Sequence, residues 1–238
     1  MEFSAKTDIG NIKDNNEDSF ITISNENVSI FAVADGMGGH DFGEEASHIA
    51  VTYIKESDKD SLCQETIKDY ITDIFNKINE KIHLTGLMKN SVLGMGTTLT
   101  MAVIMKNHMF IGHVGDSRLY LINQTIRQLT KDHSYVEELI DKGMITEKEA
   151  KTHPKKNIIT RALGTAKRIA VDIIEQPLND KDILLICSDG LSNMLEDSEI
   201  KEIVDVGDSL DITNEKMIKI AKERGGYDNI TVITVKNI

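Results

Sequence analysis

The stretch Val28-Ser-Ile-Phe31-Ala-Val-Ala-Asp35-Gly36-Met-Gly-Gly39-His40 guides the interpretation of the whole chain. Its apolar run ends abruptly in an aspartate and a cluster of glycines, a pattern typical of a buried strand with a carboxylate at its exit. A second copy lies far downstream, where Ile183-Leu-Leu-Ile-Cys-Ser188 runs into Asp189-Gly190. Two rigid strands that each deliver one carboxylate can place two hard oxygen ligands side by side. For either copy alone, a hairpin turn at Asp-Gly is the competing interpretation.

Composition limits the classes of protein that this chain can belong to. The 238 residues are enough for one sizeable domain or two small ones, and an apolar content of 40% allows a real core. Acidic residues outnumber basic ones by 39 to 27, which gives a formal net charge of −12 and argues against a general nucleic-acid-binding surface. The two cysteines, Cys63 and Cys187, make neither a disulfide framework nor a zinc site.

Targeting signals are not evident. No basic region followed by an apolar stretch opens the chain, so we expect no signal peptide. The longest apolar run, Leu99 to Met105, is far shorter than the roughly twenty residues that span a bilayer. We therefore expect a cytoplasmic monomer with no membrane segment, in which residues 1–238 form a single domain.

Periodicity predicts a mixture of helices and antiparallel strands. Short turns join successive strands, as at Lys106-Asn107, which favours antiparallel sheets over a doubly wound parallel fold. The polar region from Thr130 to Gly164 is predicted to be an appended flap that frames a site, with a capping box at Thr146 to Glu149. We expect helices at residues 43–55, 64–83 (with His83 as a C-terminal cap partner), 133–142, 197–204 (capped by Asp197) and 212–222. We expect a first strand that ends at residues 8–10, and further strands near residues 20–23, 28–34, 93–104, 108–114, 119–122, 157–164, 169–174, 183–188 and 230–235.

Four aspartates share one kind of location. Each of Asp35, Asp116, Asp189 and Asp228 stands where a predicted strand meets a glycine-containing turn. Oxygen ligands without a Cys or His cluster indicate a hard cation such as Mg²⁺ or Mn²⁺. Two such ions about 3.5–4 Å apart can share a bridging carboxylate and a bridging hydroxide, which attacks a phosphoryl group in line. No Gly-x-x-x-x-Gly-Lys-Ser/Thr loop is present, so hydrolysis of a phosphate ester fits better than a kinase reaction.

The order of the motifs resembles one family, the metal-dependent type 2C serine/threonine phosphatases, and its compact bacterial branch most. The resemblance runs from Phe3 to Val235, almost the whole chain. It rests on Asp8-Ile-Gly10, Asn16-Glu17-Asp18-Ser19, Ala34-Asp35-Gly36-Met37-Gly38-Gly39-His40, Gly94-Met95-Gly96-Thr97-Thr98, Gly115-Asp116-Ser117-Arg118, Thr160-Arg161-Ala162-Leu163-Gly164, Ser188-Asp189-Gly190-Leu191 and Asp228-Asn229-Ile230-Thr231.

This resemblance implies an α+β fold, a four-layer α/β/β/α sandwich of two antiparallel sheets flanked by helix pairs, with a flap at about residues 142–164. It implies two Mn²⁺ or Mg²⁺ ions bridged by Asp35, with the Gly36 carbonyl, Asp189 and Asp228 completing the centre. Glu17 and Asp18 would hold metal-bound waters, although a solvated turn is the other interpretation of this acidic pair. Asp116 would support a third, weaker metal beside the flap.

The same resemblance implies the activity and the partners. The enzyme would hydrolyse phosphoserine and phosphothreonine in proteins by means of a metal-bridged hydroxide. In a bacterium it would oppose a membrane-anchored serine/threonine kinase. A narrower phosphatase dedicated to one regulatory protein, and a non-catalytic sensing or scaffolding homologue, are the alternatives; joint retention of Asp35, Asp189 and Asp228 argues against the second.

Two positions depart from the family pattern. Lys13 stands where the family usually has an arginine that grips the substrate phosphate, and a lysine lacks the bidentate fork. Met37 stands where many eukaryotic members carry a histidine proposed as general acid, which leaves His40 as a candidate proton donor beside the reading of a solvated histidine. Arg118 and Arg161 could bind phosphate, but a buried ion pair with Asp116 or with a sheet carboxylate is the favoured interpretation.

Overall fold

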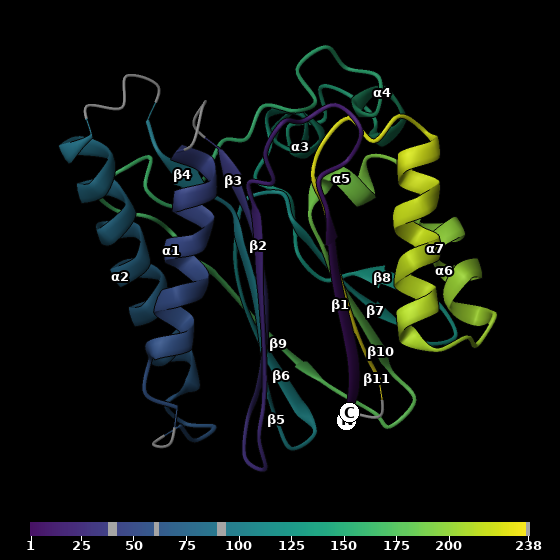
Figure 1. The fold of residues 1–238 in the computed structure, drawn as a ribbon, viewed down its shortest axis with the longest axis horizontal. Helices are drawn as coiled ribbons and strands as arrows, with labels where there is room; N and C mark the ends of the chain where they lie inside the picture. Colours follow the sequence, from purple (N-terminus) through teal and green to yellow (C-terminus); the bar gives the residue numbers. More distant parts are fainter. Residues whose placement is uncertain (38–41, 60–61, 90–93, 237–238) are drawn as a thin grey trace.

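The computed structural model describes residues 1–37, 42–59, 62–89 and 94–236. Its elements form four layers: two antiparallel sheets face each other, with α1 (Phe42–Glu56) and α2 (Ile67–Met88) outside one and α6 (Asp197–Asp205) and α7 (Leu210–Glu223) outside the other (Figure 1). The predicted fold class is confirmed. No helix in these ranges has the length and apolar character needed to cross a bilayer.

The first sheet carries the ends of the chain. Its strand order is β1-β11-β10-β7-β8. The first strand of the chain, β1, lies at the edge and pairs with the last strand, β11. Every neighbouring pair in it is antiparallel. The strands are β1 (Glu2–Asp8), β7 (Arg118–Ile122), β8 (Ile126–Gln128), β10 (Ile183–Cys187) and β11 (Ile230–Lys236).

The second sheet follows the order β2-β3-β5-β6-β9, with the short β4 paired to the end of β3. A single residue, Thr98, separates β4 from β5. The strand β3 pairs with both: Val33 lies opposite Thr100 of β5, and Gly36 lies opposite Thr97 of β4. The strands are β2 (Asp18–Ser24), β3 (Ser29–Met37), β4 (Gly96–Thr97), β5 (Leu99–Met105), β6 (His108–Val114) and β9 (Asp172–Pro177).

The apolar run of β3 is continuous because both of its faces are buried. Ile30, Ala32 and Ala34 belong to the core beneath α1 and α2, whereas Phe31 and Val33 belong to the core between the two sheets. A third core lies between the first sheet and α6 and α7. Alternate side chains of one strand therefore join two cores, which fixes its register firmly, because a slip of one residue would exchange the two faces.

Between β8 and β9 the chain forms α3 (Tyr135–Asp141), α4 (Glu147–Ala150) and connecting loops. The predicted capping box is present: Thr146 Oγ1 accepts from the Glu149 N–H group, and Glu149 Oε2 accepts from the Thr146 N–H group. The predicted strand at residues 157–164 is wrong. This segment makes only isolated bridges, Ser134 with Ile159 and Thr97 with Leu163, because its backbone bonds to two separate partners in turn.

Three boundary predictions also need correction. The strand predicted at residues 169–174 is β9, which begins at Asp172. The helix α2 continues to Met88, so His83 lies within it and its Nδ1 contacts the Gly164 carbonyl instead of capping the helix. Asp197 is the first residue of α6, and the N-terminal cap is Glu196, whose N–H group donates to Glu199 Oε2.

Candidate metal centre

Carboxylates from distant parts of the chain gather at one edge of the two sheets. The β2–β3 register places Asp18 directly opposite Asp35. Asp189 follows β10 and opens the short helix α5 (Asp189–Ser192), and Asp228 precedes β11, the antiparallel neighbour of β10. Asp116 lies in the turn between β6 and β7, at the same edge, because Arg118 at the start of β7 pairs with Cys187 at the end of β10.

Hydroxyl groups hold these carboxylates in place. The Asp35 N–H group donates to Thr98 Oγ1 at 2.9 Å, and the Thr98 hydroxyl also bonds to the Ser117 hydroxyl in the turn that carries Asp116. Ser188 and Thr231 of the first sheet donate to Asp18 Oδ2 at 2.7 and 2.6 Å. Asp18 thereby connects the second sheet to the first at the site.

The electrostatics of the cluster are unfavourable without a counter-charge. Burial raises the pKa of Asp18 to about 7 and that of Asp189 to about 6, and the charges of neighbouring aspartates add to both shifts. The pKa of Asp35 is raised well above its usual range, first by burial and then by the charges of Asp18 and Asp189. Burial, and then the charge of Asp189, also raise the pKa of Asp116 well above its usual range.

Among the residues that the structure describes, three buried carboxylate oxygens have no hydrogen-bond donor: Asp18 Oδ1, Asp116 Oδ1 and Asp189 Oδ1. A buried acceptor without a donor is costly, and repelling carboxylates make the cost larger. A hard divalent cation would relieve both effects, since it takes oxygen ligands only. Within the described residues, no group of three or more His, Cys, Asp or Glu side chains is arranged so that it could hold a metal ion. The role of these aspartates as ligands is therefore a proposal.

Glycines next to two of the aspartates let separate segments come close. A Cβ atom at Gly36 would overlap with the Gly43 carbonyl oxygen at the start of α1, and one at Gly190 would overlap with the Asn229 carbonyl oxygen. The second contact brings the segment with Asp189 against the segment with Asp228. The predicted alternative of a hairpin turn at Asp189-Gly190 is wrong, because these two residues begin the helix α5.

The loop before β2 is fixed to the start of β11 through Asn229. Its Nδ2 donates to the carbonyl oxygens of Ile9 and Asn15, and its Oδ1 accepts from the Glu17 N–H group at 2.8 Å. Within this loop, Lys13 Nζ lies 2.6 Å from Asp228 Oδ1. Burial is the largest single influence on Lys13 and lowers its pKa, but the hydrogen bond to Asp228 and the charges of the nearby carboxylates together outweigh it, so the pKa of the lysine is raised. His40 lies outside the described residues.

Arg118 and Arg161 both form ion pairs, as predicted, but the pair of Arg161 is not buried, because 32% and 43% of its two side chains are exposed. Arg161 Nη1 lies 2.6 Å from Asp172 Oδ1, a sheet carboxylate at the start of β9. Arg118 pairs with Asp132 and not with Asp116: its Nη2 and Nε both donate to Asp132 Oδ2, at 2.7 and 3.0 Å. Asp132 lies in the loop before α3, so only the folded chain brings it to Arg118.

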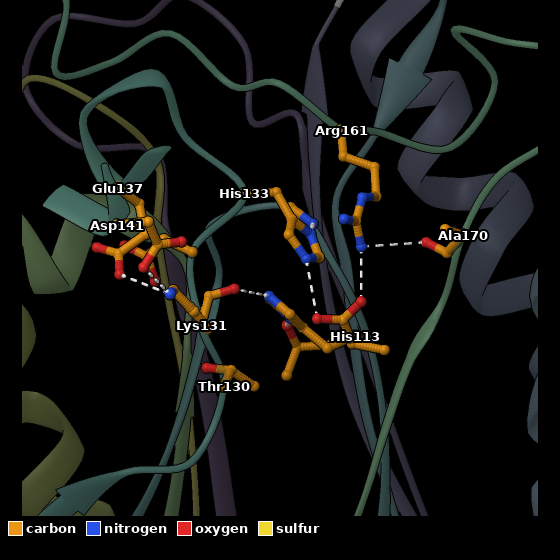
Figure 2. Close-up of polar contacts among 12 residues, drawn as sticks. His113, Thr130, Lys131, His133, Glu137, Asp141, Arg161 and Ala170 are labelled. Atoms are coloured by element: carbon orange, nitrogen blue, oxygen red, sulfur yellow. Dashed lines mark hydrogen bonds and ion pairs between the residues drawn. The ribbon is translucent and has the colours of Figure 1, made fainter. Parts of the chain in front are cut away.

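A network that the sequence analysis did not single out lies beside this edge (Figure 2). The rings of His113 and His133 stack with centroids 4.8 Å apart. His133 Nε2 lies 3.2 Å from Asp172 Oδ2, and His113 Nε2 lies 3.0 Å from the Lys131 carbonyl oxygen. Burial lowers the pKa of His113 to about 4. No local pattern marks these residues: the pairing of β6 with β9 places His113 opposite Asp172, and the backbone of Gly115 holds His133 beside them.

A groove of about 660 Å³ opens from the acidic edge. Asp116 and Asp189 stand in its wall, and it continues between the flap and the segment from α5 to α6. The ion pair between Lys151 and Glu196 connects these two sides.

Comparisons with known proteins agree with this geometry. The family described as Protein phosphatase 2C matches residues 12–225. "Serine/threonine phosphatase stp" of Listeria welshimeri is 41% identical over 99% of this chain and 96% of its own length. "Protein phosphatase PhpP" of Streptococcus pneumoniae is 38% identical over 99% of this chain and 97% of its own.

Solved structures give the same result. The serine/threonine phosphatase of S. agalactiae matches with a TM-score of 0.94 and 38% identity, covering 100% of this chain and 99% of its own. The catalytic domain of PstP, solved in complex with two manganese ions, matches with a TM-score of 0.86 and 32% identity, covering 98% and 96%. Fold and family match thus define a protein phosphatase of the 2C type, a metal-dependent class. The chain belongs to the protein phosphatase 2C family, as predicted, and it is a protein serine/threonine phosphatase.

Proposed function

We propose that this phosphatase hydrolyses phosphoserine and phosphothreonine in proteins with two divalent cations, Mn²⁺ or Mg²⁺, held at the acidic edge. Asp35 would bridge the ions, and the Gly36 carbonyl, Asp189 and Asp228 would complete their ligands. The observation that carries this proposal is the set of buried carboxylate oxygens without donors at the meeting point of the two sheets. When bound, the ions would lower the pKa of water and offset the negative charge of the phosphoryl group.

The protein's own residues would orient the reaction. Glu17 and Asp18 would accept hydrogen bonds from waters of the centre, and Asp116 would support a third, weaker cation. The ammonium group of Lys13, beside Asp228, would bind the substrate phosphate. His40 stays a hypothesis for the donor of a proton to the leaving serine.

The proposed biological setting is a bacterial cytoplasm, where the enzyme would act as a monomer and oppose a serine/threonine kinase. Cys63 and Cys187 are both free, and Cys187 is fully buried, which suits a reducing compartment. The family resemblance alone suggests the kinase.

The test is release of phosphate from p-nitrophenyl phosphate and from a phosphothreonine peptide, with Mn²⁺ and with a chelator. We expect turnover of both substrates that depends on the metal. Asp35→Asn should lower turnover more than about 100-fold and weaken Mn²⁺ binding measured by calorimetry. The matched control is Asp180→Asn, which replaces an exposed aspartate in the loop between β9 and β10 and should change neither turnover nor Mn²⁺ binding. No turnover with any metal would favour a scaffold, and poor turnover of generic peptides alone would favour a dedicated phosphatase.

A further inference from the structure

The turn that carries Asp116 is bonded at Ser117 to the hydroxyl groups of Thr98 and Thr100, and at Gly115 to one residue of another loop, His133. The Gly115 N–H group donates to His133 Nδ1 at 2.9 Å, and the His133 N–H group donates to the Gly115 carbonyl oxygen at 2.7 Å. Both backbone polar groups of Gly115 are thus bonded to His133. Gly115 has φ +115°, and a Cβ atom there would overlap with Thr98. The Thr98 hydroxyl oxygen in turn accepts a hydrogen bond from the Asp35 N–H group.

We propose that His133 is a positioning residue of this phosphatase: its imidazole fixes the turn that carries Asp116 and joins that turn to the end of the flap. The inference rests on the proposed function, in which Asp116 belongs to the metal centre. Nothing in it requires His133 to touch the substrate or a metal ion.

The hydrogen bonds define the form of the ring. Because His133 Nδ1 accepts from a backbone N–H group, the neutral ring carries its proton on Nε2. That nitrogen faces Asp172 Oδ2 at 3.2 Å, so a single tautomer satisfies both partners. Burial first, and then the charge of Arg161, lowers the pKa of His133, which favours the neutral form that can accept from Gly115.

The same carboxylate continues the connection into the flap. Asp172 Oδ1 accepts from Arg161 Nη1 at 2.6 Å, and the Thr160 N–H group donates to the His133 carbonyl oxygen at 2.8 Å. Figure 2 shows Arg161 and His133 bonded to the two oxygens of this one carboxylate. The chain of contacts from Arg161 through Asp172 and His133 to Gly115 therefore couples the position of the flap's end to the Asp116 turn.

The ring itself has little freedom to move. His133 is 8% exposed and stacks on His113, which is fully buried and bonds to the Thr100 hydroxyl and the Lys131 carbonyl oxygen. A residue behind a metal ligand, held this firmly, typically affects activity or metal affinity by about 10- to 100-fold when it is replaced.

The first test is a double-mutant cycle in phosphatase assays with Mn²⁺. His133→Phe keeps the ring stack and removes both side-chain hydrogen bonds, so we expect turnover to fall at least about 10-fold. In an Asp116→Asn background the same replacement should cost less than about 2-fold, because the residue through which it acts is already lost. His133→Asn, whose Oδ1 can still accept from Gly115, should recover most of the activity. His108→Phe, on the hairpin at the far end of β6, is the control.

Equal losses in both backgrounds would show that His133 acts independently of Asp116 and would overturn the proposal. An active Asp116→Asn enzyme beside an inactive His133→Phe enzyme would do the same.

The second test does not depend on activity. Hydrogen exchange should become faster at residues 113–118 and 158–163 in His133→Phe, and only at residues 158–163 in Asp172→Asn, which keeps the ring and its bond to Gly115. Unchanged exchange at residues 113–118 in a folded His133→Phe protein would overturn the inference. If the wild-type protein releases no phosphate with any metal, the proposed function fails, and the exchange experiment still decides whether His133 holds this turn.

Discussion

Lys13 Nζ lies 2.6 Å from Asp228 Oδ1 and 3.9 Å from Glu17 Oε2, so the cation proposed to meet the substrate phosphate is already bonded to the acidic cluster. An ammonium group is a point charge that divides its donors between these partners. A guanidinium group has five N–H donors in a planar fork and can keep a carboxylate on one side while it binds phosphate on the other.

The first prediction is that Lys13→Arg strengthens substrate binding. We expect KM for a phosphothreonine peptide to fall about 3- to 10-fold, equivalent to about 1 kcal/mol from the added charge-assisted hydrogen bond. Lys6→Arg is a suitable control, because Lys6 also pairs with two carboxylates, Asp211 and Glu215, but on the exposed surface. An unchanged KM in Lys13→Arg would remove Lys13 from the phosphate site.

The second prediction concerns the pH dependence of stability in the presence of a chelator. The pKa of Asp18 is about 7 and that of Asp189 about 6 in the folded protein, against about 3.9 in an unfolded chain. In this range the folded protein binds more protons than the unfolded chain. Its free energy of unfolding should therefore fall as the pH rises through these values.

Thermal unfolding at about pH 6.5 and about pH 7.5, with chelator and with excess Mn²⁺, measures this effect. The chelated protein should lose stability toward the higher pH, and Mn²⁺ should abolish the loss, because the cation replaces protons on the carboxylates. His113, with a pKa near 4, contributes the opposite slope below about pH 6.5 and does so with or without metal. The same slope in both conditions would contradict a metal site at these aspartates.

The sequence predicted the strands that deliver the carboxylates, because a long apolar run that stops at Asp-Gly is a strong local signal. The short turns between strands predicted antiparallel pairing, and the family resemblance predicted that the strands form two sheets. The sequence could not show that Asp18 faces Asp35, since that depends on the register of β2 against β3. It favoured an ion pair of Arg118 with Asp116 or with a sheet carboxylate, whereas the folded chain supplies Asp132, 14 residues further along, from the loop before α3. His133 was missed for the same reason, because its partners come from β6, β9 and the flap.

The third prediction tests the close approach at Gly190. A side chain there meets the Asn229 carbonyl oxygen, which is backbone and cannot rotate away. We expect Gly190→Ala to lower the free energy of unfolding by about 1–3 kcal/mol in urea denaturation and to weaken Mn²⁺ binding, because it separates the Asp189 and Asp228 segments. Gly86→Ala, inside α2 and, among the described residues outside that helix, close to Met95 alone, should change stability by less than about 1 kcal/mol, since a better helix former offsets the tight contact. Equal effects of the two replacements would contradict the argument.

The last prediction separates a structural role of Arg118 from a catalytic one. Its bidentate pair with Asp132 is mostly buried, with 27% and 13% of the two side chains exposed, and Arg118 Nη1 also donates to the Tyr120 hydroxyl. Asp132→Asn leaves this guanidinium without its counter-charge and should lower the free energy of unfolding by about 2 kcal/mol, or Tm by about 4–8 °C. Asp211→Asn, in the exposed pair with Lys6, should change Tm by no more than about 2 °C. Arg118→Lys should likewise cost stability while KM for the phosphopeptide stays within about 2-fold, because we expect the guanidinium to serve the fold through its bonds to Asp132 and Tyr120 and not to bind the substrate. A large rise in KM without a loss of stability would instead place Arg118 on the substrate.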